Sequence, residues 1–171
     1  MREGGALLTA SQMRQKPALV RVVREAPLPA GMTWLLEGAT GDATALAAAE
    51  ALTGEPTPVQ MDAAGFFVEQ ILFMPGADHY RVLGASSSAE AAELRHHMAL
   101  LMRWVHPDAQ MGKAGDPIDR SIFATRVTTA WQILKSAERR AAYDASLSSY
   151  PSALQKRHRH GPRRRRRHGS L

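Results

Sequence analysis

Two stretches of the chain carry matching apolar stripes at helical spacing, and these stripes constrain the fold more than any other feature. The first belongs to a helix predicted from Ala89 to Val105, with Ser87 and Glu90 as a capping box. The second belongs to a helix predicted to start at Asp116-Pro117. The stripe residues are Leu94, Met98, Leu101 and Val105, then Phe123, Val127, Ala130 and Leu134. Two such helices joined by a loop are predicted to form an antiparallel hairpin.

The loop between these helices opens with His106-Pro107-Asp108. Proline ends the first helix and fixes one backbone angle, which predicts a rigid tip. The imidazole and the carboxylate at that tip could bind a partner through hydrogen bonds and an ion pair with an arginine. The alternative is purely structural, with Pro-Asp ending the helix and His106 as a cation in its last turn.

Shorter motifs flank the hairpin on both sides. Before it lies Asp78-His79-Tyr80-Arg81-Val82-Leu83-Gly84, where Tyr80 and Leu83 share one face of a short helix closed by glycine. After it lies Glu138-Arg139-Arg140-Ala141-Ala142-Tyr143-Asp144. We expect Tyr80, Leu83 and Tyr143 to cover the ends of the hairpin.

The order of these motifs over residues 77–147 resembles the J-domain of DnaJ-type co-chaperones. The resemblance implies an all-α fold and a role as a co-chaperone of a DnaK-type chaperone, whose ATP hydrolysis the loop would stimulate. The partner would be bound through His106, Pro107 and Asp108, with Arg95 and Arg103 on the adjacent helix. The expected core of this module is Tyr80, Leu83, Leu94, Met98, Leu101, Val127, Ala130, Leu134 and Tyr143.

One departure from the family pattern concerns Leu100 and Trp104. They lie four residues apart and therefore share a helix face, where the family usually has basic side chains. Trp104 either lies flat on its helix without a special role or forms an apolar patch with Leu100 that residues 59–74 cover. In the second case, Phe66, Phe67 and Ile71 would supply the covering surface.

A catalytic or metal site is the remaining interpretation of His96, His97, His106 and Asp108. Adjacent histidines on a helix point about 100° apart, so His96 and His97 do not share a metal ion easily. We therefore expect a protein that is not an enzyme and that needs no metal and no cofactor.

The segment before the module, residues 1–75, is expected to be a small unit that is mostly helical from residue 42. Asp42 to Leu52 reads as a helix with Asp42 as N-cap and Gly54 as its end, and a second helix is predicted from Pro58 to Met74. The apolar runs 18–23 and 32–36 allow either a strand or a short helix.

The chain has 171 residues and no cysteine, which excludes disulfides and the zinc-binding region of longer DnaJ proteins. No apolar run is long enough to span a membrane, and the N-terminus lacks the apolar core of a signal peptide. We expect a cytoplasmic protein without a membrane contact. The sequence leaves the oligomeric state and any client protein open.

The positive charge of the chain lies in its tail. Of 22 Lys and Arg, eight lie in residues 156–168, and the other 14 are outnumbered by 16 Asp and Glu. The eight are Lys156, Arg157, Arg159, Arg163, Arg164, Arg165, Arg166 and Arg167. Residues 148–171 are expected to be disordered. The tail either binds phosphate backbones weakly and non-specifically, or it is a solvated segment that keeps the protein soluble or touches acidic surfaces generally. The alternative function is therefore a nucleic-acid-associated protein that uses the tail, with the J-like module as scaffold.

Overall fold

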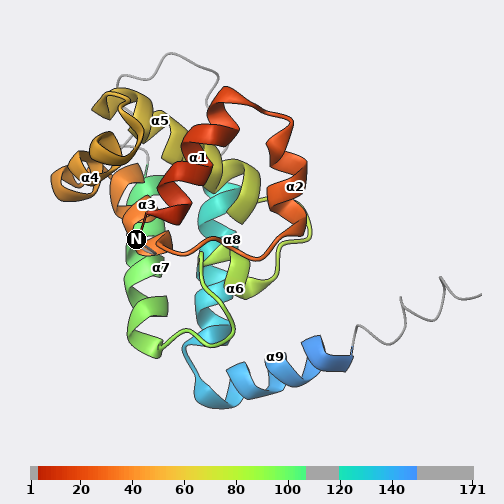
Figure 1. Ribbon diagram of the computed structural model, residues 1–171. Coiled ribbons are helices and arrows are strands. Elements are labelled where there is room, and N and C mark those ends of the chain that lie inside the picture. The colour runs from red at the N-terminus through yellow and green to blue at the C-terminus, as the bar shows by residue number, and fades with distance from the viewer. Residues whose placement is uncertain (1–3, 107–119, 150–171) are drawn as a thin grey trace, which may run out of the picture.

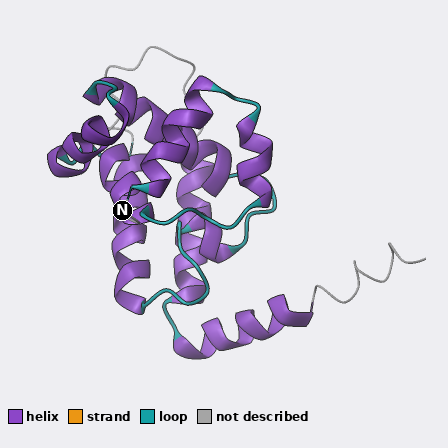
Figure 2. Ribbon diagram, in the orientation of Figure 1, coloured by secondary structure: helices purple, strands orange, loops and turns teal. Residues whose placement is uncertain are grey.

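The computed structural model describes residues 4–106 and 120–149, which form helices joined by turns, without a strand among them (Figures 1 and 2). The all-α prediction is confirmed. The helices are α1 (Gly5–Gln15), α2 (Leu19–Glu25), α3 (Met32–Ala39), α4 (Ala43–Thr53), α5 (Thr57–Phe67), the π-helix η1 (Val68–Leu72), α6 (His79–Val82), α7 (Ala91–Val105), α8 (Arg120–Leu134) and α9 (Ala137–Ser149). In the described parts, no helix has the length and apolarity needed to cross a membrane.

Helix α4 has the limits that local sequence signals predict. The carboxylate of Asp42 accepts hydrogen bonds from the backbone N–H groups of Thr44 and Ala45, at 3.0 and 2.9 Å. Gly54 follows the last residue with φ of 72°, a left-handed conformation that costs glycine little. Both signals act within a few residues, and this explains why the sequence alone could locate them.

The start of α7 differs from its prediction. The helix begins at Ala91 with Glu90 as N-cap, and no side chain caps it, so the capping box at Ser87 is wrong. Residues 86–89 form a turn in which Ala89 N donates to Ser86 O at 3.1 Å. The Arg140 guanidinium donates to the carbonyls of Ser87 and Ala89, at 2.9 and 2.8 Å. These contacts from α9 hold the turn outside the helix.

The predicted helix from Pro58 to Met74 is divided into two parts. The α-helix α5 ends at Phe67, and the chain continues as η1. Carbonyl groups near the end of η1 are bound from other helices: Arg24 donates to Gln70 O at 2.9 Å, and Arg126 donates to Phe73 O and Met74 O. Two arginines that are distant in sequence thus donate hydrogen bonds to backbone carbonyl groups in and just after the π-helix.

The N-terminal segment is helical from Gly5, earlier than the predicted start at residue 42. The runs 18–23 and 32–36, for which strand and helix were both open, lie largely in α2 and α3. Helix α1 had no predicted counterpart. It buries Ala6, Leu7, Ala10 and Met13, and it packs mainly against α5. Burial in the tertiary structure therefore explains a helix that lacks strong capping signals.

The helices α1, α3, α4 and α5 pack together, and the hairpin of α7 and α8 lies beside them (Figure 1). Helix α3 lies on α7, while α6 packs on α8 and η1. Helix α9 lies across one end of the hairpin (Figure 1). The buried apolar side chains form one continuous cluster that includes residues from Ala6 to Leu134. The N-terminal helices and the hairpin therefore share a core.

Candidate functional site

Helix α7 has one buried side and one exposed side. Its buried residues are Leu94, His97, Leu101, Trp104 and Val105. Arg95, Ala99 and Arg103 follow one another at intervals of four along the exposed side. The exposed His106 comes directly after the helix and ends it with an extended backbone, φ −63° and ψ 135°. This conformation is the one expected for a residue that precedes proline.

We call Arg95, Ala99, Arg103 and His106 the exposed stripe of α7. The stripe carries two guanidinium groups and ends at His106, the first residue of the His106-Pro107-Asp108 motif. Neither Arg95 nor Arg103 has an ion pair within the described residues. Pro107 and Asp108 lie outside the described residues, so the structure gives the site of only the first member of the triplet. The predicted basic tail, from Lys156 to Arg167, also lies outside them.

Seven of the nine predicted core residues of the module lie inside the molecule. Tyr80, Leu83, Leu94, Leu101, Val127, Ala130 and Leu134 are buried, whereas Met98 and Tyr143 are half-buried. This burial holds α7 against α8 and leaves the stripe of Arg95 and Arg103 facing outward.

Helix α9 is attached to the short helix α6 through Tyr80. The Tyr80 hydroxyl donates to Asp144 Oδ1 at 2.6 Å and accepts from Arg140 Nε at 2.9 Å. The Arg140 guanidinium also lies over the Tyr80 ring, 5.3 Å from its centroid. Burial raises the pKa of the Tyr80 hydroxyl, so the phenol stays protonated and keeps donating. The motif that contains Arg140 and Asp144 thus closes the module at the end remote from His106.

Trp104 faces the N-terminal helices and is 4% exposed. Gly65 of α5 lies against this ring: a Cβ atom added at Gly65 would lie 3.7 Å from the indole, an ordinary van der Waals distance. The Phe73 ring lies 6.1 Å from Trp104 and stacks on Phe123 of α8 at 4.6 Å, measured between centroids.

The other residues of the predicted patch follow the same pattern. Phe67 and Ile71 are fully buried, and Leu100 and Phe66 are half-buried against the core. The side of α7 that holds Trp104 is therefore inside the molecule.

Residues 78–144 match the family model named DnaJ domain. This part of the chain is a DnaJ domain. It comprises α6, α7, α8 and most of α9, with His106 directly after α7.

Relatives match the chain over a similar length. The chain is 37% identical over 73 residues to a protein named Curved DNA-binding protein from Coxiella burnetii, which covers 43% of this chain and 22% of that protein. It is 36% identical over 67 residues to the Chaperone protein DnaJ of Rickettsia bellii, which covers 39% of this chain and 17% of that protein. The chain thus spans about a fifth of the length of these relatives. Comparison with solved structures finds no significant match.

His97 links the DnaJ domain to the N-terminal helices, and sequence reasoning missed this role. Its ring is fully buried, with Nδ1 3.0 Å from Leu83 O and Nε2 2.8 Å from Thr33 Oγ1. Because a carbonyl only accepts, Nδ1 carries the proton and Nε2 accepts from the Thr33 hydroxyl. Burial lowers the pKa of His97, which favours this neutral ring. The available signal was its spacing, three residues after Leu94 and four before Leu101.

His96 points to the other side and contacts Glu37 of α3 at 3.2 Å. The two adjacent histidines therefore serve different contacts. Among the described residues, no group of His, Asp and Glu is arranged to hold a metal ion.

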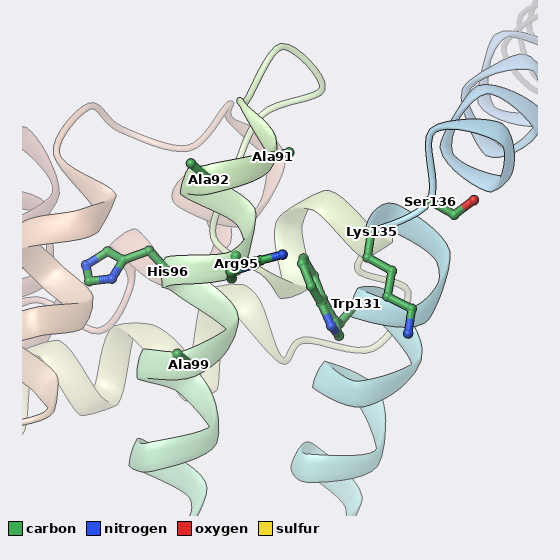
Figure 3. A pocket seen from close by; sticks show the side chains of 8 residues that line it. All are labelled: Ala91, Ala92, Arg95, His96, Ala99, Trp131, Lys135 and Ser136. Atoms are coloured by element: carbon green, nitrogen blue, oxygen red, sulfur yellow. The ribbon is translucent and has the colours of Figure 1, made fainter.

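A groove lies between the first turns of α7 and the end of α8 (Figure 3). Arg95 and Trp131 point toward one another from the two helices, and Lys135 lies one turn beyond Trp131. The groove is lined by Ala91, Ala92, Arg95, His96, Ala99, Trp131, Lys135 and Ser136. Sequence reasoning missed it because its two walls come from residues more than 30 positions apart.

Proposed function

We propose that this protein is a co-chaperone that binds a DnaK-type chaperone through its DnaJ domain and stimulates ATP hydrolysis by that chaperone. We expect it to act in the cytoplasm and to use the His106-Pro107-Asp108 loop as the stimulating element. The exposed stripe of α7 would provide the adjoining contact surface.

The observation that carries this proposal is the arrangement of α7. One side of the helix is held in the core, and the exposed stripe presents Arg95 and Arg103 in line with His106. Guanidinium groups bind carboxylates in charge-assisted hydrogen bonds, so the stripe suits an acidic partner surface. Arg95 and Arg103 are the only Lys or Arg residues of α7, so we expect a partner contact with a modest salt dependence.

The proposal is tested by the ATP turnover of a DnaK-type chaperone with and without the full chain. His106→Gln should abolish the stimulation while leaving the thermal midpoint unchanged, because the exposed imidazole at the end of α7 contributes little packing. Asp108→Asn should act in the same way, since it removes the charge and keeps the shape.

The matched control for these variants is Arg21→Gln on α2, where the side chain is 89% exposed and remote from the loop in sequence. Full stimulation by the His106→Gln protein would rule out the proposed mechanism. Loss of stimulation in the Arg21→Gln protein would show that the effect does not depend on the loop.

A nucleic-acid-associated protein is the second candidate function. Two observations favour it: the eight positive charges in residues 156–168, and the name Curved DNA-binding protein carried by relatives from Coxiella burnetii. Binding of this kind depends on phosphate contacts and weakens steeply with salt.

Deletion of residues 151–171 tests this candidate. The deletion should remove most binding to a DNA duplex at low salt and leave the thermal midpoint nearly unchanged, since this segment has few apolar side chains to bury. Duplex binding is measured against salt concentration for both proteins. An unchanged salt slope after the deletion would show that the tail is not the binding element.

A further inference from the structure

The groove between α7 and α8 is separate from the His106 tip. Ala91 and Ala92 lie in the first turn of α7, while His106 follows its last turn. His106 lies eleven positions after Arg95, which corresponds to about 16.5 Å along a helix at 1.5 Å per residue. The groove has a volume of about 770 Å³. It therefore has room for a ligand of its own at the opposite end of the hairpin.

The shape of the groove follows from side-chain size. Ala91, Ala92 and Ala99 place only methyl groups on the α7 side, opposite the large ring of Trp131 (Figure 3). Trp131 is half-buried and packs against the core, so the ring is held in place. The result is an apolar floor beside a fixed aromatic wall, which suits an aliphatic side chain.

The polar groups around this floor are donors. Arg95 and Lys135 are exposed and form no ion pair within the described parts of the chain, and the Trp131 indole N–H has no hydrogen-bond partner there. Helix α8 contains no Asp or Glu. His96 is turned away toward Glu37 (Figure 3). Glu93 interacts electrostatically with His97 and does not line the groove. The groove therefore has positive charges without a matching acid among its lining residues.

We propose that this groove binds an acidic peptide segment of a partner protein, with one aliphatic side chain of that segment on the alanine floor. Carboxylates beside the aliphatic residue would pair with Arg95 and Lys135, and a backbone or carboxylate oxygen would accept from the Trp131 indole. A nucleic acid would satisfy the cations as well, but it has no aliphatic side chain for the methyl floor. The groove shares Arg95 and Ala99 with the stripe proposed to contact the DnaK-type chaperone, whereas Trp131 and Lys135 lie outside that stripe. Peptide binding at Trp131 and Lys135 goes beyond the proposed stimulation of ATP hydrolysis.

The test uses a short fluorescein-labelled peptide with one leucine between acidic residues, and its anisotropy is measured with the full chain. We expect Lys135→Glu and Trp131→Ala each to weaken binding by roughly fivefold or more, the loss expected when a contact worth about 1 kcal/mol is removed. Arg21→Glu makes the same charge change on the exposed side of α2 and should bind like the wild type. Lys135 is exposed, so its variant should keep the fold even if Trp131→Ala does not.

Two control peptides separate the contributions of charge and shape. Replacing the acids by their amides should remove binding, and replacing leucine by glycine should weaken it several-fold. In a ¹H–¹⁵N spectrum, the acidic peptide should shift the indole resonance of Trp131, assigned from its loss in Trp131→Phe, and leave those of Trp34 and Trp104 in place. His106→Gln should bind the peptide like the wild type, so a failure of the co-chaperone proposal would not affect this one.

Several outcomes would overturn the groove proposal. These are absence of peptide binding, equal binding by the wild type and Lys135→Glu, equal binding of the leucine and glycine peptides, or an unmoved Trp131 resonance. A shift of that resonance by a single-stranded oligonucleotide alone would assign the groove to nucleic acid instead. A concentration-dependent dimer that Trp131→Ala abolishes would assign it to a second copy of the chain.

Discussion

At the scale of a residue, the side chain of His97 connects three separate elements of the fold. Its two ring nitrogens contact Leu83 and Thr33, so the ring joins α7 to the turn after α6 and to α3. Since both nitrogens are used and the ring is fully buried, the site is built for the neutral form. A proton on Nε2 would place a charge in this apolar surrounding, which costs free energy.

We therefore predict that stability falls as the pH drops below about 6.5. Burial lowers the pKa of His97 from its ordinary value of 6.5, so the unfolded chain takes up a proton at a higher pH than the folded protein. The stability contributed by the neutral ring is present above that pH and is lost below it. Each unit of difference between the two pKa values corresponds to about 1.4 kcal/mol. Urea midpoints at pH 7.5 and 5.5 measure the effect.

His97→Gln and His79→Asn separate the sources of this pH dependence. Burial also lowers the pKa of His79, so this residue acts in the same direction. His97→Gln should lower stability at pH 7.5 and flatten the change between the two pH values, since an amide does not titrate. An undiminished pH dependence in the His97→Gln protein would contradict the role of His97.

At the scale of an element, helix α9 is held on the domain by a few hydrogen bonds rather than by the burial of its side chains. None of its residues is buried, and its attachment to α6 consists mainly of the Tyr80 network with Arg140 and Asp144. His79 N also donates to the Tyr143 hydroxyl at 3.0 Å. Arg140 is the central residue, because it binds Tyr80 and the two carbonyls before α7.

Arg140→Ala should therefore release α9 locally. Loss of charge-assisted hydrogen bonds of this kind costs about 1–3 kcal/mol. Amide hydrogen exchange should become faster in α9 and in residues 86–90, whereas α7 and α8 should keep their protection. Arg139→Ala removes the exposed neighbouring arginine and serves as the control. Faster exchange throughout α7 and α8 would show that Arg140 supports the whole domain instead.

The N-terminal helices and the DnaJ domain share one core at the scale of the whole molecule. Trp104 lies at their junction, between Gly65 of α5 and Phe73. Arg126 of α8 adds a polar link, since it donates to the carbonyls of Phe73 and Met74. The two parts should consequently unfold together.

Trp104→Lys should destabilise the full protein by about 1–3 kcal/mol, because it removes a large buried side chain and brings a charge toward the core. Far-UV circular dichroism in urea should show a single transition at lower denaturant. Arg103→Ala, at the next and exposed position, should change stability by no more than about 0.5 kcal/mol. Two separate transitions, or equal costs for both variants, would contradict a shared core at Trp104.

The sequence alone determined the features that depend on local interactions. The limits of α4 follow from Asp42 and Gly54, and the two long helices follow from apolar stripes within each helix. The motifs in residues 78–144 identified the DnaJ domain, because these residues are close in sequence and recur in a fixed order.

Only the tertiary structure decided the features that join residues far apart. Arg140 keeps residues 86–89 out of α7, and Arg126 and Arg24 bind the carbonyls around η1. Burial against α5 explains α1, and the contacts of His97 connect α7 to α3. Each of these depends on hydrogen bonds or packing between segments separated by tens of residues. A periodic pattern within one segment does not show which distant side chain will form hydrogen bonds with its backbone. It also does not show which distant helix will pack against its apolar face.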